Sequence, residues 1–285
     1  MSRTALDRLP EPSPLRPMRV VGLGASRTGT LGVFLALKIL GYRPFHISEL
    51  LPHGVRQMQA LEEAMVASST SNPFTRAELD KLFGDYDPRQ DANDRKCLIE
   101  SPCYLGESGI QTYVDDPNVK FILTQRSPAS FAKSLSGSLG CYYAKLHEWP
   151  LTAARLCDGF VWELERMFRL MTFRWSHGLH PSDPGFRPAL EQSYVEYMKT
   201  VHSLVPPERV LVLDLDKGFG WEEICDFLEV EVPEEPYPRS NSMAEFHVAA
   251  EMVLAPAVRK TMMLLATSAA AVVGIGAWYL QRMSR

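Results

Sequence analysis

The stretch VVGLGASRTGTLG, residues 20–32, holds the residues best suited to chemistry. Two apolar residues lead into a glycine-rich turn, and a helical pattern, VFLALKILG, follows at once. Such a turn can hold an anion, because backbone N–H groups converge at the helix N-terminus and the helix dipole favours negative charge. Backbone N–H groups from Ser26 to Thr30, the hydroxyls of Thr28 and Thr30, and the Arg27 guanidinium supply donors. The stretch therefore predicts a site for a phosphate-like group.

Three common uses of a glycine-rich turn fit this stretch poorly. A dinucleotide site needs G-x-G-x-x-G, and Gly22 and Gly24 fit, but Arg27 takes the third glycine position and no acid follows at the expected distance. A nucleotide triphosphatase needs Lys and Ser/Thr where this chain has Thr30 and Leu31, so its usual Mg²⁺ clamp is missing. The G-x-S-x-G pattern of serine hydrolases is also absent around Ser26.

The sequence GASRTGT after a strand resembles the phosphosulfate loop of the P-loop sulfotransferases, which use 3′-phosphoadenosine 5′-phosphosulfate (PAPS). The resemblance implies that Ser26 and the run Arg27-Thr28-Gly29-Thr30 bind the 5′-phosphosulfate. In that family the 3′-phosphate is bound by an Arg at a strand end and a Ser eight residues later. TQRSPASFAKS supplies Arg126 and Ser134 at this spacing, after the apolar run VKFIL. Two motifs in the expected order strengthen the resemblance.

Other stretches are similar to one branch of that superfamily, common in fungi, and the resemblance covers roughly residues 18–247. These stretches are LGYRPFHISEL, the long segment from VHSLVPPERVLVLDLDKG to PEEPYPRSNS, and the apolar tail. The chain departs from the branch at two positions. Gly32 replaces a serine whose hydroxyl would contact the sulfonate, and Glu100-Ser101-Pro102 replaces Asp-Trp-Pro, which keeps a carboxylate on a longer side chain.

The resemblance implies sulfuryl transfer to a hydroxyl or amine of a small-molecule acceptor, with PAPS as donor and no metal. Arg27 is then expected to stabilise charge on the leaving phosphate. Glu100, at the carboxyl end of a predicted strand, is the first candidate for the general base and His46 the second. An ion pair with an arginine remains the alternative for Glu100, and a packed histidine for His46. Late in the chain, Arg239 is expected to reach the 3′-phosphate.

The elements that position these residues alternate between strand and helix. This predicts an α/β fold, here a P-loop three-layer fold with a mostly parallel sheet of about five strands. The aromatic-rich region 142–190 has no strand pattern, so we expect a helical cap that lines a pocket for an apolar or aromatic alcohol. Strands are expected at 19–24, 96–101, 119–126, 209–215 and, more weakly, 43–47; helices are expected at 30–40, 55–68, 105–115, 128–139, 152–176, 187–204 and 221–228.

Composition limits the classes of partner. The net charge of −4 over 285 residues argues against a dedicated nucleic-acid binder. Five cysteines without a CxxC pair predict reduced, mostly buried thiols and a cytosolic compartment. Only His177 and His180 lie close together, without nearby Cys or acidic ligands, so no metal site is expected.

The two ends of the chain differ from the predicted domain at 18–250. Residues 1–17 are proline-rich and charged, without the apolar core of a signal peptide, and predict a disordered arm. Residues 259–282 predict a transmembrane helix, because the uncharged part from Met262 to Leu280 is about 28 Å long as a helix. The catalytic domain would then face the cytosol, with the endoplasmic reticulum as one candidate membrane. Two other functions stay open: an NAD(P)-binding oxidoreductase-type protein, and a non-catalytic P-loop module tethered to a membrane.

Overall fold

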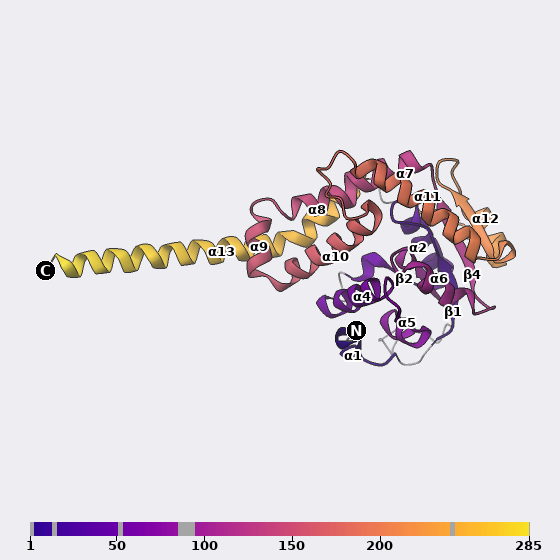
Figure 1. Ribbon diagram of the computed structural model, residues 1–285, viewed down its shortest axis with the longest axis horizontal. Helices are drawn as coiled ribbons and strands as arrows, with labels where there is room; N and C mark the ends of the chain where they lie inside the picture. The colour runs from indigo at the N-terminus through magenta and orange to yellow at the C-terminus, as the bar shows by residue number, and fades with distance from the viewer. Residues whose placement is uncertain (1–2, 13–15, 51–53, 85–94, 240–242, 285) are drawn as a thin grey trace.

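The computed structural model describes residues 3–12, 16–50, 54–84, 95–239 and 243–284. Its centre is a five-stranded parallel sheet in the order β2-β3-β1-β4-β5 (Figure 1). The predicted α/β fold with a mostly parallel sheet is confirmed, and the weak strand at 43–47 forms one edge of the sheet. The strands are β1 (Met18–Gly22), β2 (Arg43–His46), β3 (Lys96–Ile99), β4 (Lys120–Gln125) and β5 (Val210–Asp214).

Helices cover both faces of the sheet, which is why its strands are nearly continuous apolar runs. Successive side chains of a strand point to opposite faces. Accordingly, Val20 and Ile122 join one core, and their neighbours Val21 and Phe121 join the other. The first core is completed by α2 (Thr30–Ile39) and α12 (Trp221–Leu228), and the second by α4 (Val55–Ala67), α6 (Gly106–Val114), α10 (Gly159–Ser176) and α11 (Phe186–Leu204).

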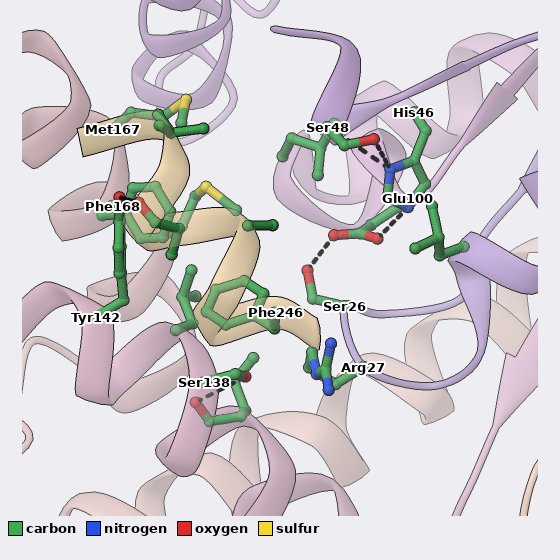
Figure 2. Close-up of a pocket in the computed structure, with 18 of the residues that line it drawn as sticks. Ser26, Arg27, His46, Ser48, Glu100, Ser138, Tyr142, Met167, Phe168 and Phe246 are labelled. Atoms are coloured by element: carbon green, nitrogen blue, oxygen red, sulfur yellow. Dashed lines mark hydrogen bonds and ion pairs between the residues drawn. The ribbon is translucent and has the colours of Figure 1, made fainter. Parts of the chain in front are cut away.

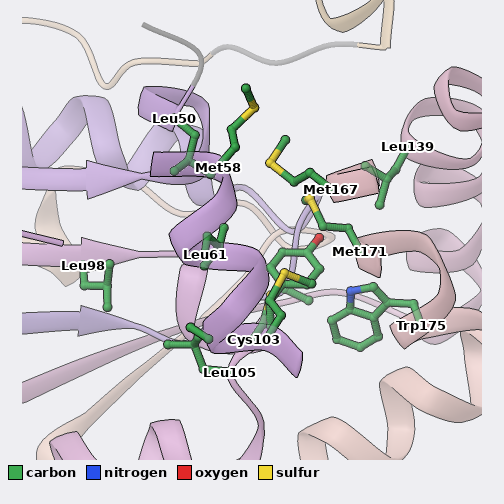
Figure 3. Packing of buried hydrophobic residues seen from close by; sticks show 14 of the residues in the cluster. Leu50, Met58, Leu61, Leu98, Cys103, Leu105, Leu139, Met167, Met171 and Trp175 are labelled. Atoms are coloured by element: carbon green, nitrogen blue, oxygen red, sulfur yellow. The ribbon is translucent and has the colours of Figure 1, made fainter. Parts of the chain in front are cut away.

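The second core is the larger, and α4 lies in its middle. Figure 3 shows Met58 and Leu61 of α4 between Leu98 of the sheet and Met171 and Trp175 of α10. All five side chains are nearly inaccessible to solvent. The helical region after β4 is therefore fixed to the sheet through α4.

The region 142–190 is helical, as predicted, but two of the expected helices are divided. The helix expected at 152–176 is interrupted because Asp158 caps a new helix, accepting hydrogen bonds from the Phe160 and Val161 N–H groups at 3.0 and 3.4 Å. The helix expected at 128–139 continues past Leu135 as a π-helical turn. The elements are α7 (Pro128–Leu135), η3 (Ser136–Gly140), α8 (Cys141–Lys145), α9 (Leu151–Cys157) and α10.

The prediction of a disordered arm at residues 1–17 is wrong for its described part. Thr4–Asp7 forms the short helix α1, and Leu6 and Leu9 are buried against α4. The Ala5 and Leu6 N–H groups donate to the Glu63 carboxylate at 2.9 and 3.2 Å. Apolar side chains on one face of a single helical turn hold the segment in spite of its charges and prolines. Residues 1–2 and 13–15 lie outside the described part of the chain.

Short elements and free thiols complete the fold. Cys97, Cys103 and Cys225 are buried, Cys141 and Cys157 are exposed, and all five thiols are free. Within the described residues, no group of three or more His, Cys, Asp or Glu side chains is arranged to hold a metal ion. The remaining elements are η1 (Ile47–Glu49), α5 (Arg76–Leu82), η2 (Ser101–Tyr104) and η4 (Pro207–Arg209).

The C-terminal helix, α13 (Met243–Met283), is much longer than the predicted span and contains Pro256. Its first part packs on the domain, where Leu254, Ala257 and Thr261 are buried. From Met262 onward the helix is exposed and projects beyond the rest of the chain (Figure 1). By length and composition it is long and apolar enough to cross a membrane, and its apolar part is not buried against the rest of the described chain.

Candidate functional site

The predicted site residues follow four neighbouring strands at one edge of the sheet. In spatial order, His46 ends β2, Glu100 follows β3, the glycine-rich loop follows β1, and Arg126 follows β4. Because all four strands are parallel, their carboxyl ends share this edge, where α/β proteins bind ligands. Residues far apart in the sequence therefore meet in one site, and Figure 2 shows those that follow β1, β2 and β3.

The glycine-rich loop is shaped by close packing against β4. A Cβ atom at Gly24 would lie 1.8 Å from the Thr124 hydroxyl oxygen, so no larger residue fits there. The Thr28 hydroxyl, which the sequence analysis assigned to the anion, instead donates to the Ala25 carbonyl oxygen at 2.7 Å and lies 2.7 Å from the Thr124 hydroxyl. Thr28 is fully buried, so its side chain holds the shape of the loop.

The loop ends at Gly29, which has a φ of 100° and immediately precedes α2. Arg27 also adopts the left-handed conformation, with a φ of 70°. The left-handed conformation costs a non-glycine residue roughly 1–2 kcal/mol of conformational energy. Residues strained in this way cluster at ligand sites. The first N–H groups of α2, beginning at Thr30, have no partner within the helix and are available to an anion.

Two arginines from separate motifs meet beside the loop. The Arg27 Nε atom donates to Ser134 Oγ at 3.4 Å, and Arg126 Nη1 donates to the Arg27 carbonyl oxygen at 3.2 Å. Arg126 Nη2 lies 3.5 Å from an Asp216 carboxylate oxygen, whereas its buried Nε has no hydrogen-bond partner in the described part of the chain. Burial lowers the pKa of Arg27; Arg126 lowers it further, and the Glu100 charge opposes the shift. The site thus holds two guanidinium groups, which favours an anionic ligand.

Glu100 is the centre of a buried hydrogen-bond network. Its carboxylate accepts from Ser26 Oγ at 2.5 Å and from Thr30 Oγ1 at 2.6 Å, and it lies 2.7 Å from His46 Nε2. Ser26 Oγ also lies 2.5 Å from the Tyr104 hydroxyl. The network joins the glycine-rich loop to β2 and to η2.

The network determines the protonation state of Glu100. Burial alone would raise its pKa, but the His46 charge and the hydrogen bonds from His46, Ser26 and Thr30 outweigh burial and lower the pKa. A strongly held carboxylate with three donors is a weak general base. This lowered pKa argues against the role of general base expected for Glu100, and its ion-pair partner is His46 rather than an arginine.

His46 is oriented from both sides of its ring. Its Nδ1 atom accepts from the Ser48 backbone N–H at 3.2 Å and lies 2.8 Å from Ser48 Oγ. In the neutral ring with Nδ1 as the acceptor, Nε2 carries the proton and donates to Glu100. The arrangement of hydroxyl, imidazole and carboxylate is one in which the basic ring nitrogen faces a hydroxyl and the carboxylate orients the ring.

A cavity of about 330 Å³ adjoins this network. Most of its polar side chains lie at the sheet edge, where Arg27, His46, Ser48 and Glu100 line it, and Ser138 and Glu245 line it elsewhere (Figure 2). The rest of the lining is mostly apolar and comes from α10, from the segment around η3 and, unexpectedly, from α13. Apolar and aromatic residues among them are Leu139, Tyr142, Leu164, Met167, Phe168, Met171, Phe246, Ala250 and Val253.

Comparison with known sequences identifies the family. The profile of a family described as "Sulfotransferase domain" matches residues 19–246, which is most of the chain. The protein belongs to this sulfotransferase family. Its sulfotransferase domain extends from β1 to the first turn of α13, so it includes both arginine motifs. The match favours the sulfotransferase resemblance over the NAD(P)-binding alternative.

A curated relative is similar over much of its length. The protein named "Ava biosynthesis cluster protein M", from Aspergillus versicolor, is 30% identical over 227 residues. The aligned region is 78% of this sulfotransferase-family chain and 80% of the relative.

Two residues singled out in the sequence, Gly32 and Arg239, have surroundings in the sulfotransferase domain that differ from those expected. Gly32 is a point of close contact, since a Cβ atom there would lie 3.1 Å from the Pro238 carbonyl oxygen and 3.4 Å from the Tyr237 hydroxyl. A serine would therefore crowd this segment, and glycine fits it. Arg239 comes directly after Pro238 and is exposed. Because Pro238 lies beside Gly32, Arg239 is near the start of α2.

Sequence reasoning missed three contributors to the site of the sulfotransferase domain. Tyr104 and Ser48 extend the network through their hydroxyls, and Phe246 of α13 lies over Arg27, with 5.5 Å between the guanidinium carbon and the ring centroid. Both hydroxyls lie near predicted site residues, but neither Tyr104 nor Ser48 is part of a sequence motif that would have marked it as a site residue. The α13 contact had a detectable pattern: Phe246, Ala249 or Ala250, and Val253 recur at helical spacing ahead of the predicted span.

Proposed function

We propose that the protein transfers a sulfuryl group from PAPS to a hydroxyl or amine of a small-molecule acceptor. The observation that carries this proposal is the meeting of Arg27, Arg126 and Ser134 beside a glycine-rich turn at a helix N-terminus. The buried Arg126 Nε has no hydrogen-bond partner among the described residues, which suits a ligand with a second phosphate, because an unmet buried donor is costly.

The residues present fit the two anionic ends of the donor. Arg27, with the backbone around Gly29 and Thr30, would hold the 5′-phosphosulfate. Arg126 and Ser134 would hold the 3′-phosphate, and Arg239 is a further candidate for it. When bound, PAPS supplies the activated sulfuryl group. In this arrangement Arg27 stabilises the charge that develops on the leaving phosphate without reorganising, because its loop fixes it in place.

His46 serves as the general base in this proposal, and Glu100 positions it. The basic Nδ1 atom of His46 faces Ser48, whose hydroxyl lines the cavity. A proton from the acceptor hydroxyl passes to Ser48 Oγ while the Ser48 proton passes to His46 Nδ1. Glu100 then stabilises the imidazolium through Nε2.

Ligand titration tests the donor site. We expect adenosine 3′,5′-bisphosphate to raise the melting temperature, and NADPH and ATP to have little effect. Arg27→Ala and Arg126→Ala should each weaken bisphosphate binding at least about tenfold, since a hydrogen bond to a charged group contributes about 1.5–3 kcal/mol. Arg19→Ala, on an exposed residue of β1 away from the loop, is the matched control.

The outcomes separate the alternatives. Stabilisation by NADPH alone would refute the sulfotransferase proposal in favour of an oxidoreductase-type protein. Stabilisation by none of the three nucleotides would favour a non-catalytic module.

The general base has a separate test. His46→Gln should lower kcat with the acceptor by about 10²–10⁴-fold and change bisphosphate affinity much less, because the imidazole reaches the anion-binding loop only through Glu100 and the Thr30 side-chain hydroxyl, 3.4 Å from Nε2. A kcat within a factor of three of the wild type, roughly 0.6 kcal/mol, would exclude His46 as the base.

We also propose that the exposed part of α13 anchors the protein in a membrane, with the catalytic domain in the cytosol. The apolar surface from Met262 onward supports this, since it has no protein partner in the described residues. Val272→Lys with Ile275→Lys should release the full chain on alkaline carbonate extraction, because lysine at a span centre costs about 2.5–3.5 kcal/mol. Val232→Lys, exposed and outside α13, should stay in the pellet.

Protease treatment of sealed microsomes tests the orientation. Digestion of the catalytic domain without detergent supports a cytosolic location, and protection from digestion would contradict it. Co-fractionation with an endoplasmic reticulum marker tests the membrane.

A further inference from the structure

The cavity and the exposed tail share a single helix. Phe246 of α13 lies over Arg27 at one end of the cavity, and Val253 lines the cavity seven residues later. At 1.5 Å per residue, the cavity therefore extends about 10 Å along α13. The same helix continues to the exposed apolar stretch, which begins at Met262, about 14 Å beyond Val253. The end of the cavity farthest from the sheet is thus the end nearest the tail.

The polar lining of the cavity is concentrated at the sheet edge, and Ser138, Tyr142 and Glu245 are the polar lining residues elsewhere. Ser48, His46 and Glu100 lie at the sheet edge, and Figure 2 shows Tyr142, Met167 and Phe168 on the opposite side. A ligand that fills this space has one hydroxyl at the catalytic end and an apolar body. Each buried methylene contributes about 0.8 kcal/mol, so the long apolar wall favours such a body strongly.

The surface beside the emerging tail is also apolar. Trp149 and Leu156 are 66% and 78% exposed, and α9, which contains Leu156, packs against α13 (Figure 1). Arg259 is exposed at the same end, and Lys260 pairs with Asp158 at 2.9 Å. Exposed tryptophan and basic residues at the base of an apolar helix are typical of a membrane interface. This end of the domain therefore faces the lipid headgroups.

The depth of the headgroup layer brings the cavity close to the bilayer. Each headgroup region is roughly 5–8 Å thick, so the Val253 end of the cavity lies within about two helical turns of it.

We propose that the acceptor is a membrane-partitioned alcohol with one hydroxyl and an elongated apolar body, taken up at the tail end of the cavity. This rests on the proposed function, because sulfuryl transfer assigns the cavity to the acceptor. The acceptor inserts its hydroxyl toward Ser48 and His46 while α13 forms one wall along its body. The anchor thus holds the cavity beside the lipid bilayer, where such an alcohol concentrates.

Photolabelling of the full chain in phosphatidylcholine vesicles tests the proposal. The probe is a dodecanol that carries a diazirine in mid-chain, and the butanol equivalent is the comparison. We expect dodecanol to label peptides with Met167–Met171 and Ala249–Val253 at least about tenfold more than butanol does, because its longer chain is buried. Ala250→Trp should remove most of this labelling by filling the cavity. Ala255→Trp, an exposed position on the same helix, should leave it unchanged.

The outcomes distinguish the two proposals when bisphosphate binding is measured on the same vesicles. Labelling confined to the tail, or equal labelling of wild type and Ala250→Trp, overturns the acceptor proposal, and retained bisphosphate binding then leaves the proposed function intact. Labelled cavity peptides without bisphosphate binding overturn the proposed function and leave a site for a lipophilic ligand. If Ala250→Trp no longer binds bisphosphate, Val253→Trp provides the second test of the same wall.

Discussion

Replacing Glu100 by glutamine tests the network that joins the loop to the sheet. The variant keeps the size of the side chain but removes the charge that accepts from Ser26, Thr30 and His46. A charge-assisted hydrogen bond is about twice as strong as a neutral one, a difference of roughly 1 kcal/mol per bond. Three such bonds imply a loss of about 3 kcal/mol in the free energy of unfolding. The loss falls toward about 2 kcal/mol if the hydroxyls rotate to accept from the amide.

The dependence on pH gives this prediction a second, independent readout. The pKa of Glu100 is lowered in the folded protein, so the unfolded chain takes up a proton at higher pH than the native state does. Its stabilisation is therefore fully present above the unfolded pKa of about 4.5 and is lost as the pH falls through the lowered folded pKa. The difference in stability between wild type and Glu100→Gln should be full at pH 7 and shrink below about pH 4.

Urea unfolding of the full chain in detergent, followed by tryptophan fluorescence, measures both effects. Glu107→Gln, at an exposed glutamate of α6, is the control and should unfold with the wild type. A Glu100→Gln protein as stable as wild type at pH 7 would show that the network contributes little. A difference that does not change with pH would show that the carboxylate is not held in its charged form.

Three further substitutions test other parts of the structure. Gly32→Ser should lower the free energy of unfolding by about 1–2 kcal/mol, and Gly32→Ala equally, because the Cβ crowds Pro238; a stabilised serine variant would contradict this. Burial and Glu163 raise the pKa of Glu62 to about 8, so the native state keeps a proton that the unfolded chain releases. Stability should fall as the pH rises from about 5 to 8, and Glu62→Gln should flatten this dependence in melting experiments. Thr28→Val should cost about 1–3 kcal/mol, because the buried Thr124 hydroxyl loses its hydrogen bond to Thr28 and the Ala25 carbonyl loses one of its two donors; an unchanged melting temperature would argue that the hydroxyl does not hold the loop.

Strand and helix positions were predictable because they depend on local periodicity. The strands at 119–126 and 209–215 and the helix at 221–228 correspond closely to β4, β5 and α12. The break between α9 and α10 at Asp158 was harder to predict, because the helix cap of a single aspartate interrupts an apolar pattern that continues through the sequence. The short apolar face at Leu6 was obscured by the charges and prolines around it.

The site was predictable in its residues but not in their interactions. Arg27, Arg126 and Ser134 come together as the paired motifs indicated. The charge state of Glu100 depends on donors that reach it from the ends of β1 and β2, and their meeting is a property of strand order. No local pattern around Glu100 carries that information.

The continuity of α13 has a practical consequence for engineering this family. A soluble version made by cutting the chain before Met243 would lose Phe246, Ala250 and Val253 along with the tail. Its acceptor preferences would then describe an opened cavity and not the native one. Under the two proposals above, exchanging the whole helix between relatives would likewise transfer a specificity element together with a membrane anchor. The proposed anchor and the proposed acceptor wall would therefore be linked traits, and a junction after Thr261 is the place to separate them.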